Sequence, residues 1–181
     1  MKLITTTPNP VLTAPARTVT SFDKRLAKLI RDMKATLRGA KYPKGVGLAA
    51  PQIGEPWRVF VTRPTEKIEI RVFINPEILT RSDKLTDGVP ERDNKLEGCL
   101  SIPKIWGRVK RTQELTLKYQ DETGGFHTEK FSGFLATIIQ HETDHTNGVL
   151  FVQRVLEQKG KLYQSTRDEE GKEILEEVTV T

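Results

Sequence analysis

The chain has 181 residues, of which 36% are hydrophobic and 29% charged, a balance typical of one globular domain with a sizeable core. No stretch reaches the roughly 18 apolar residues that a membrane-spanning helix requires, and the start lacks the apolar run of a signal peptide. We therefore expect a cytoplasmic protein with no membrane partner. The net charge of +5 is spread along the sequence, which indicates a solvated basic surface or loose attraction to an RNA-rich surface. The sequence has no motif for sequence-specific nucleic-acid binding.

The first predicted element is an amphipathic helix over residues 21–38, with Ser21 as its candidate N-cap. Its core-facing positions recur at helical spacing: Leu26, Leu29, Ile30, Met33 and Leu37. Glycines and Pro43 then end the helix. Short apolar or alternating runs predict strands at residues 57–62, 68–75, 114–120 and 126–131. The polar segment 81–95 predicts a surface loop, and residues 121–125 predict a turn.

A second helix is predicted over residues 133–146, where an apolar face precedes Asn147-Gly148. The apolar run VLFV that follows, residues 149–152, predicts a buried segment. In the charged tail, residues 168–171 predict a hairpin turn and the last four residues are strand-like. Strands segregated from two helices predict an α+β fold, with short antiparallel sheets packed around the second helix and an amphipathic helix near the N-terminus.

The strongest functional signal lies inside the second helix, in the sequence His141-Glu142-Thr143-Asp144-His145. Four residues advance an α-helix by about 400°, so the two histidines lie one turn apart on one face and can bind the same metal ion. Glu142 is offset by about 100°, which lets its carboxylate approach water at that ion without being a ligand. The segment therefore predicts a metal site with Glu142 as general base.

A catalytic metal site requires a third protein ligand and an open position. His127 is available, but it lies in a predicted hairpin strand. The single cysteine, Cys99, is favoured because Gly98 before it allows close approach of the backbone. Cys99, His141 and His145 would form a sulfur–nitrogen–nitrogen donor set that suits Fe(II), Zn(II), Ni(II) or Co(II).

A glycine-rich segment at residues 45–52, GVGLAAPQ, is another candidate part of the site. It is either a tight turn leading into a strand or a surface that lies against the backbone of a substrate. In the second case the Gln52 side-chain amide is a donor for a developing oxyanion. The backbone N–H of Leu100, directly after Cys99, is placed to point at a bound group.

Together these segments resemble the peptide deformylase family. GVGLAAPQ at residues 45–52, EGCLS at 97–101 and QHETDHTNG at 140–148 are similar to its three motifs and occur in the same order. The resemblance runs from about residue 7 to residue 155. It implies that residues 1–181 are one catalytic domain, whose tail over residues 157–181 falls in the variable region of the family.

The resemblance implies hydrolysis of the N-formyl group of formyl-methionyl nascent peptides, with release of formate. Cys99, His141 and His145 are then expected to hold one divalent metal ion. Fe(II) is the usual ion of the family, with Zn, Ni or Co as substitutes. Besides the nascent peptide, the ribosome surface is a further partner that the basic charge allows.

The resemblance also implies roles for other motif residues. Glu142 is expected to act as general base and acid, while Gln52 and the Leu100 N–H stabilise the oxyanion. Gly47, with its neighbour Val46, is expected to contact the substrate backbone.

An apolar pocket is required for the methionine side chain. Phe134 and Ile138 lie seven and three residues before His141, so they project from the helix face that carries the histidines. They either line this pocket or belong only to the core.

Two other functions remain compatible with the sequence. A zinc peptidase can use the same helix, but its third ligand usually lies downstream, where no histidine or cysteine follows His145. An inactive module that binds peptides or ribosomes needs neither Glu142 nor Gln52, so the presence of both residues argues against it.

Overall fold

The computed structural model describes residues 1–40 and 44–178. Its helices are α1 (Lys24–Gly39), α2 (Gly133–Thr146) and α3 (Phe151–Glu157), with short 3₁₀ helices at Pro10–Leu12 and Ala50–Ile53. Within these residues the strands form two antiparallel sheets. The first has the order β1 (Gly47–Ala49), β2 (Val59–Thr62), β3 (Arg71–Arg81), β6 (Glu114–Gln120) and β7 (Phe126–Ser132). The second has the order β4 (Glu97–Cys99), β5 (Ile102–Gly107), β8 (Leu162–Arg167) and β9 (Glu173–Val178).

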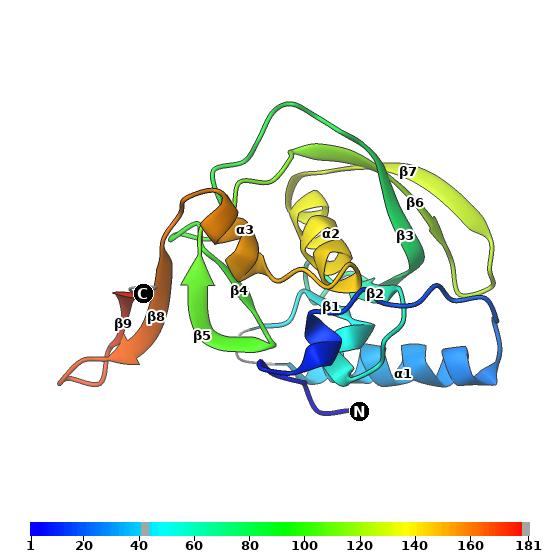
Figure 1. The fold of residues 1–181 in the computed structure, drawn as a ribbon, viewed down its shortest axis with the longest axis horizontal. Helices are drawn as coiled ribbons and strands as arrows, with labels where there is room; N and C mark the ends of the chain where they lie inside the picture. The colour runs from blue at the N-terminus through cyan, green and yellow to red at the C-terminus, as the bar shows by residue number, and fades with distance from the viewer. Residues whose placement is uncertain (41–43, 179–181) are drawn as a thin grey trace.

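Helix α2 lies at the centre of the molecule, between the two sheets (Figure 1). It contacts β1, β2, β6 and β7 of the first sheet, and α1 also packs against β1 and β2. Side chains alternate along the fully buried β2, so Val59 and Val61 join the cluster under α1 while Phe60 joins the cluster under α2. This arrangement confirms the predicted α+β class.

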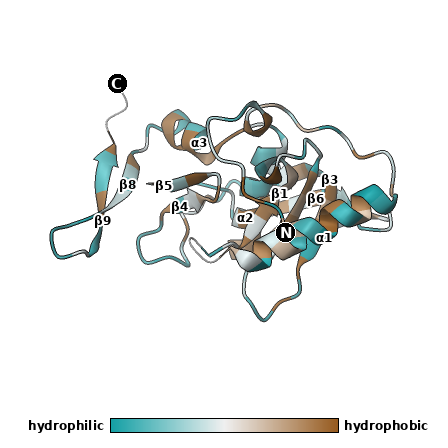
Figure 2. Cartoon of the chain, turned by 90° about the horizontal axis from the view of Figure 1, so that it is seen from below, coloured by the Kyte–Doolittle hydropathy of each residue, from teal (hydrophilic) through white to brown (hydrophobic). Residues whose placement is uncertain are grey.

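The predicted N-terminal helix is present, but it begins at Lys24 instead of residue 21, and its N-cap is Asp23 and not Ser21. The Asp23 carboxylate accepts hydrogen bonds from the backbone N–H groups of Arg25 (2.9 Å) and Leu26 (3.1 Å). A carboxylate satisfies both groups, and its charge is favourable at the positive end of the helix dipole, which explains the choice of cap. The buried face is the predicted one, and Figure 2 shows hydrophilic and hydrophobic residues alternating along α1.

Helix α2 has the predicted bounds, and it is buried on almost every side from residue 136 to residue 146. It ends before Gly148, whose φ of 74° lies in the left-handed region. A Cβ atom on Gly148 would lie 2.7 Å from the carbonyl carbon of Ala14 and 2.8 Å from the carbonyl oxygen of Thr13. The missing side chain therefore lets the N-terminal segment pass close to the end of α2.

The strands predicted at residues 114–120 and 126–131 are confirmed as β6 and β7, and residues 57–62 contain β2. The predicted turn also joins β6 to β7, where the backbone N–H of Asp121 donates to the carbonyl of Gly125 (2.9 Å).

Strand β3 differs from its prediction at both ends. It begins at Arg71 rather than at residue 68, and it continues to Arg81, well beyond the predicted end at Asn75. Pro76 has no N–H to donate, and the strand accommodates it because the register shifts between Ile74 and Glu77. The predicted surface loop therefore begins at residue 82.

The sequence patterns missed β4, β5 and α3. Strand β4 has three residues and the register shifts between Gly98 and Cys99, so neither it nor its partner β5 shows a clear alternation. The VLFV run is largely buried as predicted, but it leads into α3, whose buried Phe151 and Val155 lie one turn apart.

The charged tail forms a hairpin of β8 and β9 around the predicted turn at residues 168–171. Leu162 and Val178 pack against the cluster that contains Phe151 and Val155. Two predictions fall partly outside the described residues. They are Pro43 at the end of the first helix, and residues 179–181 of the strand-like C-terminal run. In the described part of the chain, no helix is long and apolar enough to cross a membrane.

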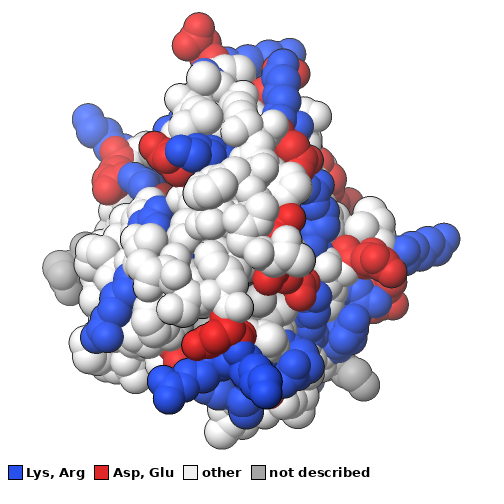
Figure 3. All heavy atoms as spheres, turned by 90° about the vertical axis from the view of Figure 1, so that its right-hand side faces the viewer, with Lys and Arg blue, Asp and Glu red and all other residues white. Residues whose placement is uncertain are grey.

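The surface charge is mixed on the face that Figure 3 shows. Lysine and arginine side chains lie among aspartates and glutamates around a largely uncharged centre, with several basic groups gathered at the lower edge. On this face the positive net charge is therefore not gathered into one uniform basic surface.

The end of α2 gives a test of the packing. We expect Gly148→Ala to lower the free energy of unfolding by about 2–5 kcal/mol, because a left-handed residue with a Cβ costs about 1–2 kcal/mol and overpacking against residues 13 and 14 about 1–3 kcal/mol more. Gly171→Ala is the control, since Gly171 has a φ of 79° but nothing within 4 Å of its added Cβ. Equal losses in urea unfolding of the two variants would contradict the close contact.

Candidate metal centre

Three donor atoms from two elements converge in the structure. Cys99 is the last residue of β4, and His141 and His145 lie one turn apart on α2. One ligand atom of each residue lies within 4.8 Å of the other two, and Cys99 Sγ is 3.2 Å from His145 Nε2. The structure thus brings together the three residues that the sequence singles out. The alternative ligand His127 lies on β7, where its Nε2 is 2.6 Å from Asp121 Oδ2.

This donor set fits a first-row transition metal ion. With bonds of about 2.3 Å to sulfur and about 2.0 Å to nitrogen, a tetrahedral site separates the two donor atoms by about 3.5 Å, close to the separation between Cys99 and His145. His141 Nδ1 donates to Glu97 Oε1 (2.6 Å), which leaves Nε2 as its ligand atom. The exposed fractions of Cys99 and His145 are 4% and 1%, so a bound ion would be shielded from water on this side.

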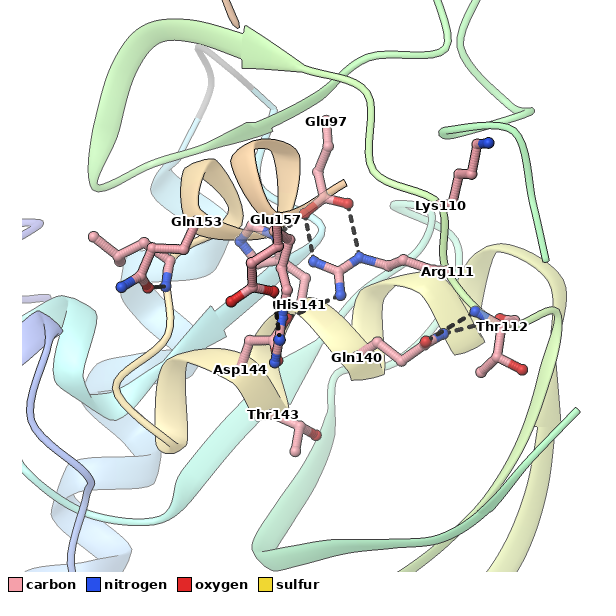
Figure 4. A network of polar contacts seen from close by, with 12 residues as sticks. Glu97, Lys110, Arg111, Thr112, Gln140, His141, Thr143, Asp144, Gln153 and Glu157 are labelled. Atoms are coloured by element: carbon pink, nitrogen blue, oxygen red, sulfur yellow. Dashed lines mark hydrogen bonds and ion pairs between the residues drawn. The ribbon is translucent and has the colours of Figure 1, made fainter. Parts of the chain in front are cut away.

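A buried ion-pair network holds β4 against α2 (Figure 4). The Arg111 guanidinium donates from Nε and Nη2 to the two oxygens of Glu97 (2.8 and 2.7 Å) and from Nη1 to Asp144 Oδ2 (3.0 Å). Arg154 of α3 donates to the other oxygen of Asp144 (2.7 Å). Because Glu97 also accepts from His141, the network orients the ring of this candidate ligand as well as the two elements.

The network and the burial set the charges of the site. Burial would raise the pKa of Glu97, but Arg111 and His141 outweigh it and hold that pKa well below its usual range. Glu97 in turn overcomes the effect of burial and raises the pKa of His141. Burial and the charge on His141 lower the pKa of His145, which keeps its ring neutral, as a metal ligand must be. Burial raises the pKa of Glu142 to about 7.

Gln52 is anchored beside the cysteine by the short 3₁₀ helix that follows β1. Its Oε1 accepts the backbone N–H of Ala49 (2.8 Å), so its Nε2 points to Cys99 Sγ (3.4 Å) and Ser101 Oγ (3.3 Å). Fixing one end of the amide in this way presents the NH₂ group to the space next to the sulfur.

Gly47 and Glu142 are in direct contact. A Cβ atom on Gly47 would overlap the Glu142 carboxylate, so a larger residue at this position of β1 would require that carboxylate or the strand to move. The other carboxylate oxygen, Oε2, is buried without a hydrogen-bond partner among the described residues. Glu142 is therefore packed in place with an acceptor that remains available.

A pocket opens next to these groups. It lies between β1, β4 and the first turns of α2, and every site residue predicted from the sequence lines it except the buried His145. Its lining residues are Lys44, Gly45, Val46, Gly47, Gln52, Val89, Arg92, Glu97, Gly98, Cys99, Leu100, Phe134, Thr137, Ile138, His141 and Glu142. Phe134 and Ile138 supply part of its apolar wall.

The N-terminal segment, residues 1–17, ties the three motif segments together through backbone hydrogen bonds. The N–H of Thr5 donates to the carbonyl of Gln52 (2.7 Å), and that of Thr7 to Ser101 (3.0 Å). Further along, the N–H of Ala16 donates to the carbonyl of Thr146 at the end of α2 (2.9 Å).

Sequence reasoning missed Glu97 and Arg111. Glu97 stands two residues before Cys99, so on a strand it lies on the same face, and this signal was available once β4 was recognised. Arg111 lies in the irregular segment between β5 and β6, and nothing in its neighbourhood along the sequence distinguishes it from other arginines.

A buried cysteine–histidine–histidine set beside a glutamate on an H-E-x-x-H helix is the arrangement of a metal-dependent hydrolase. The sequence model of the family described as "Polypeptide deformylase" matches residues 1–161. Peptide deformylase of Treponema pallidum (strain Nichols) is 41% identical over 150 residues, which cover 83% of this chain and 85% of that protein. Peptide deformylase of Desulfotalea psychrophila is 38% identical over 164 residues, 88% and 90% of the two chains.

Solved structures agree with these relatives. The crystal structure of peptide deformylase from Thermotoga maritima superposes with a TM-score of 0.75 at 37% identity, covering 85% of this chain and 97% of that one. The Met-Ala-Ser-bound class I type b peptide deformylase from Acinetobacter baumannii has a TM-score of 0.74 at 33% identity, covering 85% and 98%. The chain belongs to the peptide deformylase family. It is a hydrolase that acts on formyl-methionyl peptides and removes their N-formyl group, and the family is metal-dependent.

The ion-pair network makes Arg111 a sensitive position. We expect Arg111→Met to lower the free energy of unfolding by about 3–5 kcal/mol, because Glu97 and Asp144 would keep buried charges without their shared cation. Metal affinity should also fall about 10- to 100-fold, since Glu97 would no longer be held against His141. Urea unfolding and metal titration measure the two effects.

Lys161→Met is the matched control, because it removes an exposed ion pair with Glu177 and should change unfolding little. Unfolding of Arg111→Met that matches this control would show that the network does not stabilise the site.

Proposed function

We propose that this chain hydrolyses the formyl group at a metal ion held by Cys99, His141 and His145, with Glu142 as general base and acid. The observation that carries this proposal is the convergence of one sulfur and two imidazoles next to a packed carboxylate, at a pocket. When bound, the ion would lower the pKa of a water molecule and polarise the formyl carbonyl. We propose Fe(II) for this ion, following the family resemblance, and the donor set also suits Zn, Ni or Co.

The role of Glu142 follows from its position. It stands next to the ligand His141 on α2, its carboxylate packs on Gly47, and its Oε2 has no other partner among the described residues. From this place it would take a proton from the attacking water and pass it to the nitrogen of the departing peptide. Its contact with β1 would keep the carboxylate aimed at the reacting group.

Gln52 and Leu100 are proposed to stabilise the oxyanion. The Gln52 amide is already oriented by Ala49, so its NH₂ group would meet the developing charge without reorganisation. Leu100 directly follows the ligand Cys99 and lines the same pocket, which would place its backbone N–H on the other side of the oxygen.

The pocket suits an extended peptide with an apolar first side chain. Strands β1 and β4 stand at the edges of the two sheets, and both flank the pocket, so the peptide would add as a strand to one of these edges beside Val46 and Gly47. Phe134 and Ile138 would receive the methionine side chain. The relative from Acinetobacter baumannii binds Met-Ala-Ser, the peptide that deformylation of formyl-Met-Ala-Ser would leave.

Two further parts of the function stay proposals. We propose residues 1–181 as one catalytic domain, and contact with the ribosome surface as a partner interaction that rests on the net charge of +5.

The first test replaces the proposed base. In an anaerobic preparation, wild type should release formate from formyl-Met-Ala-Ser, and Glu142→Gln should lower kcat by about 10²- to 10⁴-fold, because the proton transfer is lost. Metal content should stay near one ion per chain in Glu142→Gln but fall in His141→Ala, which loses a ligand. Cleavage of internal peptide bonds by wild type, or full formate release by Glu142→Gln, would overturn the proposal.

Gly47 gives a second test. In Gly47→Ala the new Cβ would displace the Glu142 carboxylate or shift β1, and a misplacement of about 1 Å at a catalytic group can lower the rate about 100-fold. We therefore expect a loss of kcat/KM of that order in formate release, with metal content unchanged. Wild-type kcat/KM in Gly47→Ala would rule out the packing role.

A further inference from the structure

Helix α1 carries the whole net charge of the chain. Of the 29 basic and 24 acidic residues in the sequence, six basic residues and one acidic residue lie in α1, which gives this helix a net charge of +5. The rest of the chain holds 23 residues of each sign and is neutral. The side of the molecule on which α1 lies in Figure 1 is the lower edge in Figure 3, where basic groups gather. The excess of positive charge is therefore local and belongs to one helix.

Four basic residues of α1 form one stripe along the helix. Lys24, Lys28, Arg31 and Arg38 follow one another at intervals of four, three and seven residues, so they lie within about 80° of one another around the helix axis. This face is opposite the buried side chains of α1, and all four residues are exposed. With a rise of about 1.5 Å per residue, the α1 stripe is about 21 Å long.

Most of the α1 stripe has no acidic partner. Lys28 pairs with Asp32 (2.7 Å), which also accepts from the N-terminal ammonium group (3.4 Å). In the described part of the chain, no hydrogen bond or ion pair involves the side chains of Lys24, Arg31 and Arg38. Three cations therefore face solvent at intervals of about 10 Å along the helix, and their charge is not compensated within the chain.

We propose that the α1 stripe binds the phosphate backbone of RNA. Contacts to phosphates require accessible cations and no reading of the bases, and a row of like charges suits a polymer that carries a charge on every unit. Arg31 and Arg38 also present planar guanidinium groups, which match the geometry of a phosphate. The inference goes beyond the proposed function, because it assigns the RNA contact to one helix and does not depend on the metal chemistry.

A lipid surface fits this helix less well than RNA does. Helices that lie on membranes insert an apolar face between the lipids. The apolar face of α1 is buried, and the helix packs against β1 and β2. Only the charged side of α1 is thus available to a partner, which favours a partner that is recognised by charge alone.

The C-terminal end of the α1 stripe adjoins the metal pocket. Ala40, two residues after Arg38, accepts the backbone N–H of Gly45 (3.1 Å), and Gly45 lines the pocket. A Cβ atom on Gly45 would also lie 2.9 Å from Cδ1 of Leu37 in α1. RNA bound along α1 would therefore end beside the pocket, and a peptide that emerges from an RNA-rich surface would have a short path to it.

The test measures binding of the full chain to an RNA duplex of about 24 base pairs by fluorescence anisotropy, from about 50 to 200 mM salt. Each phosphate contact contributes about −0.9 to the slope of log K against log salt, so four contacts predict a slope of about −3 to −4 in wild type. The triple variant Lys24→Gln, Arg31→Gln and Arg38→Gln should bring the slope to about −1 and weaken binding about tenfold or more. Glutamine preserves helix propensity, and none of the three residues lines the pocket, so formate release from formyl-Met-Ala-Ser should stay at the wild-type rate.

The triple variant Lys84→Gln, Lys110→Gln and Lys172→Gln is the matched control, because it removes the same charge from exposed positions outside α1. It should keep most of the wild-type affinity and slope. Equal weakening by the two triple variants, or a wild-type slope near zero, would overturn the proposal. Binding of wild type to vesicles of anionic phospholipid but not to the duplex would overturn it as well, in favour of a membrane. Failure of the proposed function would look different, since wild type would then bind the duplex but release no formate.

Discussion

The candidate metal centre depends on one buried cation, the Arg111 guanidinium. It joins Glu97, two residues before the candidate ligand Cys99, to Asp144, which stands between the candidate ligands His141 and His145 along α2. Two carboxylates in an apolar interior would each lose their hydration, and the shared guanidinium replaces it with hydrogen bonds of 2.7–3.0 Å. A strand and a helix that are distant in the sequence thereby take one fixed relative position, which is the condition for a shared metal ion.

The same arrangement places the substrate. Because α2 is buried between two sheets, only its first turns, His141 and Glu142 reach the pocket, and the edge strands β1 and β4 flank that opening. The proposed catalytic groups therefore come from a helix and from strand ends, while the proposed peptide recognition would use the edges of β1 and β4. The C-terminal hairpin of β8 and β9 extends the second sheet on the side of β5 that faces away from β4, the strand that carries Cys99.

Sequence reasoning succeeded where the signal is local. The helical period predicts the bounds of α2 and the alternation of β6, and the one-turn spacing of His141 and His145 predicts that their ligand atoms lie close together, as the structure shows. It failed where the cause is tertiary. Pro76 indicates the end of a strand unless the register shift beside it is known. Arg111 pairs with residues that are distant in the sequence, and the residues next to it show no pattern that indicates this role. These features are fixed by packing between segments, which a pattern of neighbouring residues does not record.

The backbone contacts of the N-terminal segment also bear on how the site forms during folding. Its contacts reach the glycine-rich segment, the cysteine segment and the end of α2, which are spread from Gln52 to Thr146. Contacts between residues so far apart in the sequence form slowly and together, because loop closure must precede them. During synthesis, an incomplete polypeptide that lacks α2 would hold no functional centre. Activity would therefore begin only after α2 has been added to the chain, because this helix supplies two of the three candidate ligands.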